Sequence, residues 1–124
     1  MEQSPFGVIL RASNKDETKA FYERLGIKFS EHKHGNGPLH YACEFKGTVL
    51  EIYQGRKQDE PKQEHEYRSA GETTLYIELP PELPMDQSTA GMKIITVIRD
   101  RALVVLQDPD GRAVIVAKQE EGNV

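Results

Sequence analysis

Residues 7–26, GVILRASNKDETKAFYERLG, join a strand pattern directly to a helix pattern. From Phe6 to Ala12 the more apolar side chains fall on the even positions, which predicts a strand with one more hydrophobic face. A helix over residues 15–25 should follow, because Asn14 is a favourable N-cap and Gly26 can adopt the left-handed conformation that ends many helices. This stretch therefore predicts a strand followed at once by a helix.

Three strand-like segments come next, at residues 27–34, 39–46 and 48–54. The turn sequence Gly35-Asn36-Gly37-Pro38 separates the first two, and Lys46-Gly47 separates the last two. Together with the preceding strand and helix, these segments complete a βαβββ unit.

The dipeptide Lys46-Gly47 also predicts how its two flanking strands pair. If it forms a two-residue hairpin turn, three opposed pairs share the face that suits the helix: Phe45 with Thr48, Cys43 with Leu50, and Tyr41 with Ile52. The other face carries His40, Ala42 and Glu44 opposite Tyr53, Glu51 and Val49. This polar and aromatic mixture is typical of the lining of a cleft rather than of a core.

The second half of the chain repeats this organisation with one departure. Strands are predicted at residues 73–79, 93–99, 103–107 and 112–118, and the tetrapeptide Asp108-Pro109-Asp110-Gly111 fits a type I turn between the last two. The turn glycines before the two final strands are 111 − 47 = 64 residues apart, about half the chain. Between residues 80 and 91 three prolines leave room for only one or two helical turns.

We therefore expect an α+β fold built from two βαβββ modules, the second with a shortened helix. The first module covers residues 5–54 and the second covers residues 71–119. Residues 55–70 carry eight balanced charges and a proline, which indicates a solvated linker between the modules.

Length, charge and cysteine content exclude several classes of protein. The 124 residues suit one domain, and 16 basic against 20 acidic residues give a net charge of −4, which disfavours nucleic acids and acidic membranes as partners. Cys43 is the only cysteine, so no intramolecular disulfide forms, and we expect it to be a buried core thiol. With no leader pattern and no apolar run long enough to span a bilayer, the sequence predicts a soluble, cytoplasmic protein.

The sequence resembles the vicinal oxygen chelate superfamily, which includes glyoxalases, extradiol dioxygenases, fosfomycin resistance enzymes and bleomycin resistance proteins. Four stretches carry the resemblance: residues 7–14 (GVILRASN), 20–26 (AFYERLG), 48–53 (TVLEIY) and 108–111 (DPDG). It implies two modules that fold into curved mixed sheets around a cleft, often completed by a second subunit.

In the metal-dependent members of this superfamily, each module supplies one metal ligand from its first strand and one from its last. The corresponding positions here are Gly7 and Glu51 in the first module and approximately Thr74 and Ile115 in the second. Only Glu51 offers a charged ligand, whereas a catalytic metal site generally needs about three protein ligands. The resemblance therefore implies a protein with no bound metal and no cofactor, closer to the bleomycin resistance proteins than to the glyoxalases.

The candidate binding residues come from the mixed hairpin face and from the strands expected beside it. We expect the cleft to be lined by Glu51, His40, Tyr53, Tyr76, Arg11 and Thr74. A histidine near a carboxylate can act as an acid or base near neutral pH, which gives His40 a possible catalytic role beside Glu51. His32 and His34 alternate onto one strand face and suggest metal ligands, but the glycine loop beside them indicates an exposed strand end.

Three functions are compatible with these residues. The leading hypothesis is a homodimeric protein that binds a small organic molecule without a metal. The second is a lyase, isomerase or dioxygenase whose divalent ion is held by a rebuilt ligand set, such as His40 with Glu51 and a residue of another subunit. The third is an interaction module that binds no ligand.

Overall fold

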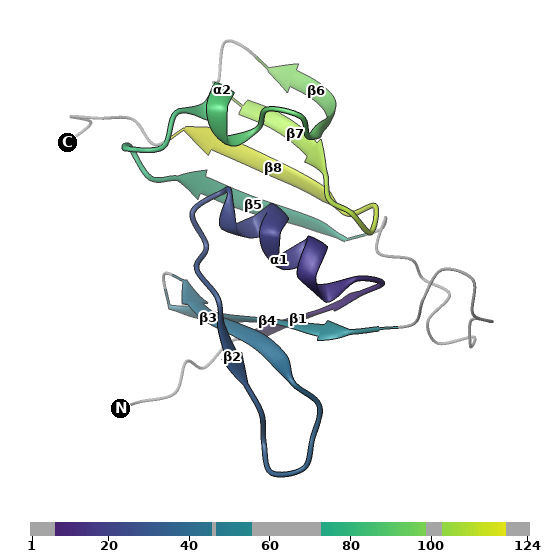
Figure 1. Cartoon of the computed structure of the whole chain (residues 1–124). Helices are drawn as coiled ribbons and strands as arrows, with labels where there is room; N and C mark the ends of the chain where they lie inside the picture. The colour runs from purple at the N-terminus through teal and green to yellow at the C-terminus, as the bar shows by residue number, and fades with distance from the viewer. Residues whose placement is uncertain (1–6, 46, 56–72, 99–102, 119–124) are drawn as a thin grey trace. The chain divides into compact units, whose positions relative to one another are not determined.

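The computed structural model describes residues 7–45, 47–55, 73–98 and 103–118. These residues form two compact units, of which the second also includes residues 24–26. Each unit contains one four-stranded mixed sheet (Figure 1). The expected α+β fold with two βαβββ modules is therefore confirmed. Of the linker predicted at residues 55–70, all but Gly55 lies outside the described residues.

The first unit has the element order β1, α1, β2, β3 and β4. Its bounds are β1 Gly7–Ala12, α1 Lys15–Glu23, β2 Ser30–His32, β3 His40–Phe45 and β4 Thr48–Gln54. The strands lie in the order β1-β4-β3-β2, with β1 parallel to β4 and the other pairs antiparallel. Strand β4 is therefore an inner strand, with β1 on one side and its hairpin partner β3 on the other.

Helix α1 begins at the cap that the sequence predicts. The Asn14 side-chain oxygen accepts hydrogen bonds from the backbone N–H groups of Asp16 and Glu17, both at 3.1 Å. The helix ends at Glu23, two residues before the predicted end, and Gly26 follows with a φ of 96°. A residue with a side chain would be strained at this φ, so the glycine allows the chain to turn away from the helix.

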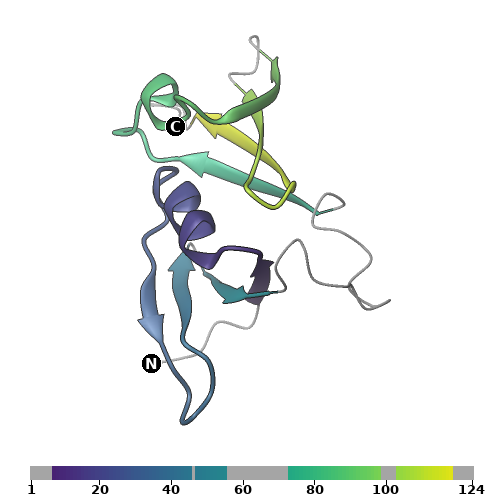
Figure 2. The same ribbon diagram turned by 45° about the vertical axis from the view of Figure 1, so that its right-hand side comes forward.

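The first sheet has two unlike faces. Figures 1 and 2 show α1 along one of them, and the side chains of Leu10, Tyr41 and Ile52 on that face are buried. The Tyr41 hydroxyl donates a hydrogen bond to the Asp16 carboxylate of α1, which ties the helix to β3. We call the opposite face the open face; it carries the odd-numbered residues of β1 and β4 and the even-numbered residues of β3.

The predicted hairpin register is confirmed. Tyr41 pairs with Ile52, Cys43 with Leu50 and Phe45 with Thr48. Cys43 was expected to be fully buried but is only half-buried. Desolvation raises the pKa of its thiol. The thiol is therefore held in its neutral, weakly nucleophilic form.

Strand β2 is shorter than predicted and leaves His34 in a loop. Ile27 does not start the strand, because its N–H bonds to the Tyr22 carbonyl at the end of α1 and its side chain is buried. After His32 the chain turns, and the Gly37 N–H donates to the His34 carbonyl at 2.8 Å. His34 therefore lies outside β2, and the alternation of faces along the strand does not set the direction of its side chain.

The second unit repeats the topology of the first. Its bounds are β5 Thr74–Leu79, α2 Met85–Ser88, β6 Lys93–Ile98, β7 Leu103–Gln107 and β8 Ala113–Lys118, in the strand order β5-β8-β7-β6. Gly7 pairs with Val49 in the first sheet and Thr74 with Ala113 in the second, so the last strands are again 113 − 49 = 64 residues apart. The four-residue α2 is the expected shortened helix. Among the described residues, no helix has the length and apolar character to cross a membrane.

The turn before β8 is organised by a buried carboxylate. Asp108 Oδ1 accepts hydrogen bonds from the backbone N–H groups of Asp110 and Arg112, both at 2.9 Å, and Oδ2 lies 3.0 Å from the Arg112 guanidinium. Gly111 has a φ of 94°, and its N–H donates to the Asp108 carbonyl. One side chain therefore fixes the turn and neutralises a buried cation.

We predict that Asp108→Ala lowers the free energy of unfolding by about 3 kcal/mol, because it removes the nearer carboxylate from the buried Arg112 guanidinium, leaving Asp110 at 3.6 Å, and removes the acceptor of two backbone N–H groups. Asp86→Ala, which removes an exposed carboxylate from α2, should change stability by only a few tenths of a kcal/mol. Urea unfolding of both variants measures the difference. Equal stability of the two variants would contradict the structural role of Asp108.

A second prediction concerns Tyr41 at high pH. Its hydrogen bond to Asp16, together with burial, raises the pKa of Tyr41 from 10.0 to about 12. The folded state thus favours the neutral phenol, so this stabilisation is present below pH 10 and is lost as pH rises through 12. Tyr41→Phe should lower the free energy of unfolding by about 1 kcal/mol at pH 7 and flatten its decline between pH 10 and 12.

Urea unfolding at pH 7, 10 and 11.5 tests this prediction. Tyr76→Phe is the matched control, because Tyr76 is 59% exposed. A decline as steep in Tyr41→Phe as in the unsubstituted chain would show that Tyr41 does not contribute to it.

Candidate functional site

Four of the six predicted binding residues lie together on the open face of the first sheet. Arg11 is in β1, Glu51 and Tyr53 are in β4, and His40 begins β3. The strand register brings them together, since Arg11 pairs with Tyr53 and Glu51 lies opposite Ala42, two residues along from His40. The hairpin register predicted from the sequence accounts for the shared face of His40, Glu51 and Tyr53, and the role of these residues in binding stays a prediction.

Stacked rings connect these residues across the sheet. The rings of His40 and Tyr53 are nearly parallel, with centroids 4.2 Å apart and planes at 8°. The His34 ring stacks on that of His40 with centroids 5.1 Å apart, and the Arg11 guanidinium carbon lies 5.3 Å from the centre of the Tyr53 ring. Such ring and cation contacts form a flat aromatic surface with a cation at one end.

His40 is the buried centre of this arrangement, at 1% exposure. Its Nδ1 lies 3.2 Å from the Pro38 carbonyl oxygen. A carbonyl can only accept, so Nδ1 carries the proton of this hydrogen bond. In the neutral ring, the lone pair therefore resides on Nε2.

The Nε2 atom of His40 faces the Glu51 carboxylate without a hydrogen bond. The distance from Nε2 to Glu51 Oε2 is 3.3 Å, within the range of an ion pair. The alignment does not satisfy a hydrogen bond, and Nε2 has no hydrogen-bond partner among the described residues. When the ring is neutral, Nε2 and the carboxylate both accept, so their separation of 3.3 Å is unfavourable unless a positive charge lies between them.

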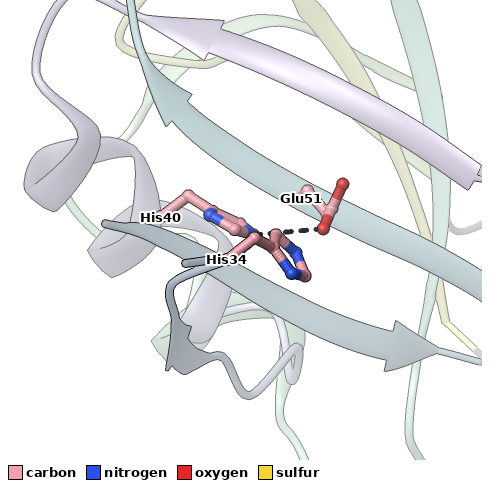
Figure 3. A group of neighbouring side chains, drawn as sticks. All are labelled: His34, His40 and Glu51. Carbon is pink, nitrogen blue, oxygen red and sulfur yellow. Dashed lines mark ion pairs between the residues drawn. The ribbon is translucent and has the colours of Figure 1, made fainter. Parts of the chain in front are cut away.

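His34 completes a cluster that the sequence interpretation did not assemble. Figure 3 shows its ring beside that of His40, with the Glu51 carboxylate near both. One potential ligand atom from each of His34, His40 and Glu51 lies within 4.8 Å of the other two. His34 was predicted to sit at an exposed strand end; it is exposed, and it lies in the β2–β3 loop, where the Gly37 N–H bonds to its carbonyl.

His32 does not join this cluster. Its Nε2 lies 3.2 Å from the Ser30 hydroxyl, and its ring centroid is 6.1 Å from that of His40. The alternation of His32 and His34 was therefore a poor guide, because only the residue beyond the strand reaches Glu51. The signal that could have identified His34 is the pair of glycines that follows it.

The remaining two candidates, Thr74 and Tyr76, lie in the second unit. Both are exposed on β5, on the side away from the buried Ile77. Their part in a common binding site stays a prediction.

The ligand positions of the metal-dependent relatives do not fit a metal here. Gly7 has no side chain, and Ile115 is apolar. Glu51 pairs with Ile9 of β1, and Ile115 pairs with Tyr76 of β5, so the residues paired with them on β1 and β5 supply neither a carboxylate nor an imidazole. Of the positions that hold metal in those relatives, only Glu51 retains a metal-binding side chain.

Several solved structures share this fold over nearly the whole chain. No family model matches the chain, and no curated protein matches it in sequence. The trypanothione-dependent glyoxalase I of Leishmania major matches with a TM-score of 0.65 and 19% identity, over 94% of this chain and 87% of that one.

Two further structures match over nearly the whole of both chains. TnmS3, an antibiotic-binding protein from Streptomyces sp. CB03234, matches with a TM-score of 0.59 and 16% identity, over 97% of this chain and 97% of that one. Lactoylglutathione lyase from Agrobacterium tumefaciens matches with a TM-score of 0.56 and 13% identity, over 99% and 98%. The chain therefore has the fold of the vicinal oxygen chelate superfamily.

Proposed function

We propose that this protein binds a small organic molecule on the open face of its first module. The observation that carries the proposal is the stack of His34, His40, Tyr53 and Arg11 beside the carboxylate of Glu51. TnmS3 has the same fold and is described as an antibiotic-binding protein, which supports this class of function.

The chemistry of the face favours a flat ligand with a polar substituent. The half-buried Tyr53 ring already contacts the His40 ring and the Arg11 guanidinium, and Arg11 is exposed, so a flat ligand would stack on the guanidinium or take its place over the ring. Small-molecule sites commonly combine aromatic surface with a few polar groups that orient the ligand. Glu51 supplies a hydrogen-bond acceptor on the same face, and binding of this kind requires no metal at the superfamily's ligand positions.

We also propose that the protein works in the cytoplasm, on the basis of its single cysteine. Its only thiol, Cys43, is half-buried with a raised pKa, which suits a protein that needs no oxidising compartment to fold.

A screen for thermal stabilisation tests the binding proposal. A ligand that binds only the folded state at 100 times its Kd should add about 2.7 kcal/mol of stability. Tyr53→Ala should weaken binding of any hit about tenfold, whereas Tyr53→Phe, which keeps the ring, should retain it. Each variant is compared with its own ligand-free state. No stabilisation across a broad library would favour the interaction module instead.

We further propose that the protein forms a homodimer through β6. This strand lies at the edge of the second sheet and exposes four large apolar side chains, Ile94, Ile95, Val97 and Ile98, at 38–52%. An exposed apolar edge is a ready surface for another strand or chain. A second copy is the natural occupant, since an identical edge is self-complementary about a twofold axis. The irregularity between Ile94 and Thr96 interrupts the edge, so side chains rather than a long ladder would carry the contact.

Light scattering after size-exclusion chromatography tests the dimer. Val97→Lys should convert a dimer to a monomer, because the ammonium group would be desolvated at the contact. Glu82→Lys introduces the same side chain at an exposed loop position and should leave the mass unchanged. A monomeric unsubstituted chain would exclude this proposal.

A further inference from the structure

We propose that His34, His40 and Glu51 form a binding site for a divalent transition-metal ion within the first module alone. The site differs from the superfamily's arrangement, because it shares only Glu51 with the positions Gly7, Glu51, Thr74 and Ile115. It does not depend on the binding of an organic ligand.

The first step of the argument is the state of the His40 ring. Its Nδ1–H donates to the Pro38 carbonyl, which leaves Nε2 as the atom available to a ligand. Histidines that bind metals commonly donate their other N–H to a backbone carbonyl or a carboxylate, which holds the ring in position. The relative exposure of His40 is only 1%, and its Nε2 has no hydrogen-bond partner in the described part of the chain.

The second step is the spacing of His40 and Glu51. For bonds of about 2.0–2.1 Å in a tetrahedral site, two ligand atoms lie about 3.3 Å apart. The distance from His40 Nε2 to Glu51 Oε2 is 3.3 Å. Two acceptors at this distance repel each other, and a cation bound by both converts that repulsion into attraction.

The third step is the position of His34. Its ligand atom lies within 4.8 Å of those of His40 and Glu51, so a small rotation of an exposed side chain would bring it into a common coordination sphere. Its backbone is held by the turn that Gly37 closes. An added Cβ at Gly37 would lie 3.0 Å from the His34 carbonyl oxygen, so this tight turn favours glycine.

The donor set indicates the class of metal. Two imidazoles and one carboxylate suit a borderline ion such as Zn²⁺, and a site with three protein ligands leaves a position open for water or another oxygen donor. The absence of a thiolate in the set argues against a closed structural zinc site. Only one module supplies ligands, so the ion does not require a second subunit.

Isothermal titration of ZnCl₂ into chelator-treated full-length protein is the primary test. We expect one Zn²⁺ per chain. His34→Ala and Glu51→Gln should each weaken the affinity at least about tenfold, since even the loss of an outer partner of a ligand commonly has this effect. His32→Ala is the matched control, because this neighbouring histidine lies outside the cluster, and it should bind Zn²⁺ like the unsubstituted chain.

A spectroscopic measurement covers the chance that a variant is misfolded. In long-range ¹H–¹⁵N spectra of the unsubstituted protein, Zn²⁺ should shift Nε2 of His40 and a ring nitrogen of His34 but neither nitrogen of His32. No stoichiometric binding, unchanged affinity in His34→Ala and Glu51→Gln, or shifts confined to His32 would each overturn the site. In that case Nε2 of His40 carries a proton and forms an ion pair with Glu51.

The outcome of the zinc titration does not depend on the outcome of the small-molecule screen. The zinc titration contains no organic molecule, and the small-molecule screen is run on chelator-treated protein. Zinc binding without any organic hit would support the metal site and contradict the proposed function, and the reverse pattern would do the opposite.

Discussion

The register of the β3–β4 hairpin is the constraint on which the first module depends. Successive side chains of a strand point to opposite faces, so a slip of one residue would exchange the two faces completely. In the observed register Tyr41 and Ile52 face α1, while Glu51 and Tyr53 share the open face with His40. Gly47 supports this register at the tip of the hairpin with a φ of 83°, a conformation that glycine adopts without strain. The buried face against α1 and the candidate site on the open face therefore both follow from the pairing of β3 with β4.

Burial of His40 sets the chemistry of the open face. A buried imidazole must satisfy both nitrogens, and Pro38 satisfies only Nδ1. The neighbouring carboxylate cannot donate a hydrogen bond when it is ionised, so Nε2 is satisfied only by a proton or by a cation shared with Glu51. The ring stack with Tyr53 limits the freedom of the imidazole to turn away from this choice. The unusual feature of this face is therefore that the fold holds the Nε2 atom of a neutral His40 close to the Glu51 carboxylate, which is also an acceptor.

The sequence was sufficient for the sheet pairing but not for the full site. Strand alternation and a turn glycine act locally, so the grouping of His40, Glu51 and Tyr53 followed from residue positions alone. The place of His34 depends on a loop whose path is set by the Gly37–His34 hydrogen bond, and no periodic pattern encodes that path. The strand predicted over residues 27–34 is shorter in the structure, because Ile27 is buried and its N–H bonds to the Tyr22 carbonyl of α1, so the strand begins only at Ser30.

In this chain the strand topology and the side chains available to bind a metal are separate properties, as the cluster of His34, His40 and Glu51 illustrates. Of the four ligand positions that the family resemblance implies, Glu51 carries a side chain that binds metals, whereas Gly7 and Ile115 offer no donor. Imidazoles in the β2–β3 loop and at the start of β3 lie close to the same carboxylate from the opposite side of β4. Because β4 is the central strand, Glu51 has neighbours on both sides, β1 and β3. The β3 side of β4 can therefore supply donors to Glu51 where Gly7 of β1 supplies none, within the same strand topology.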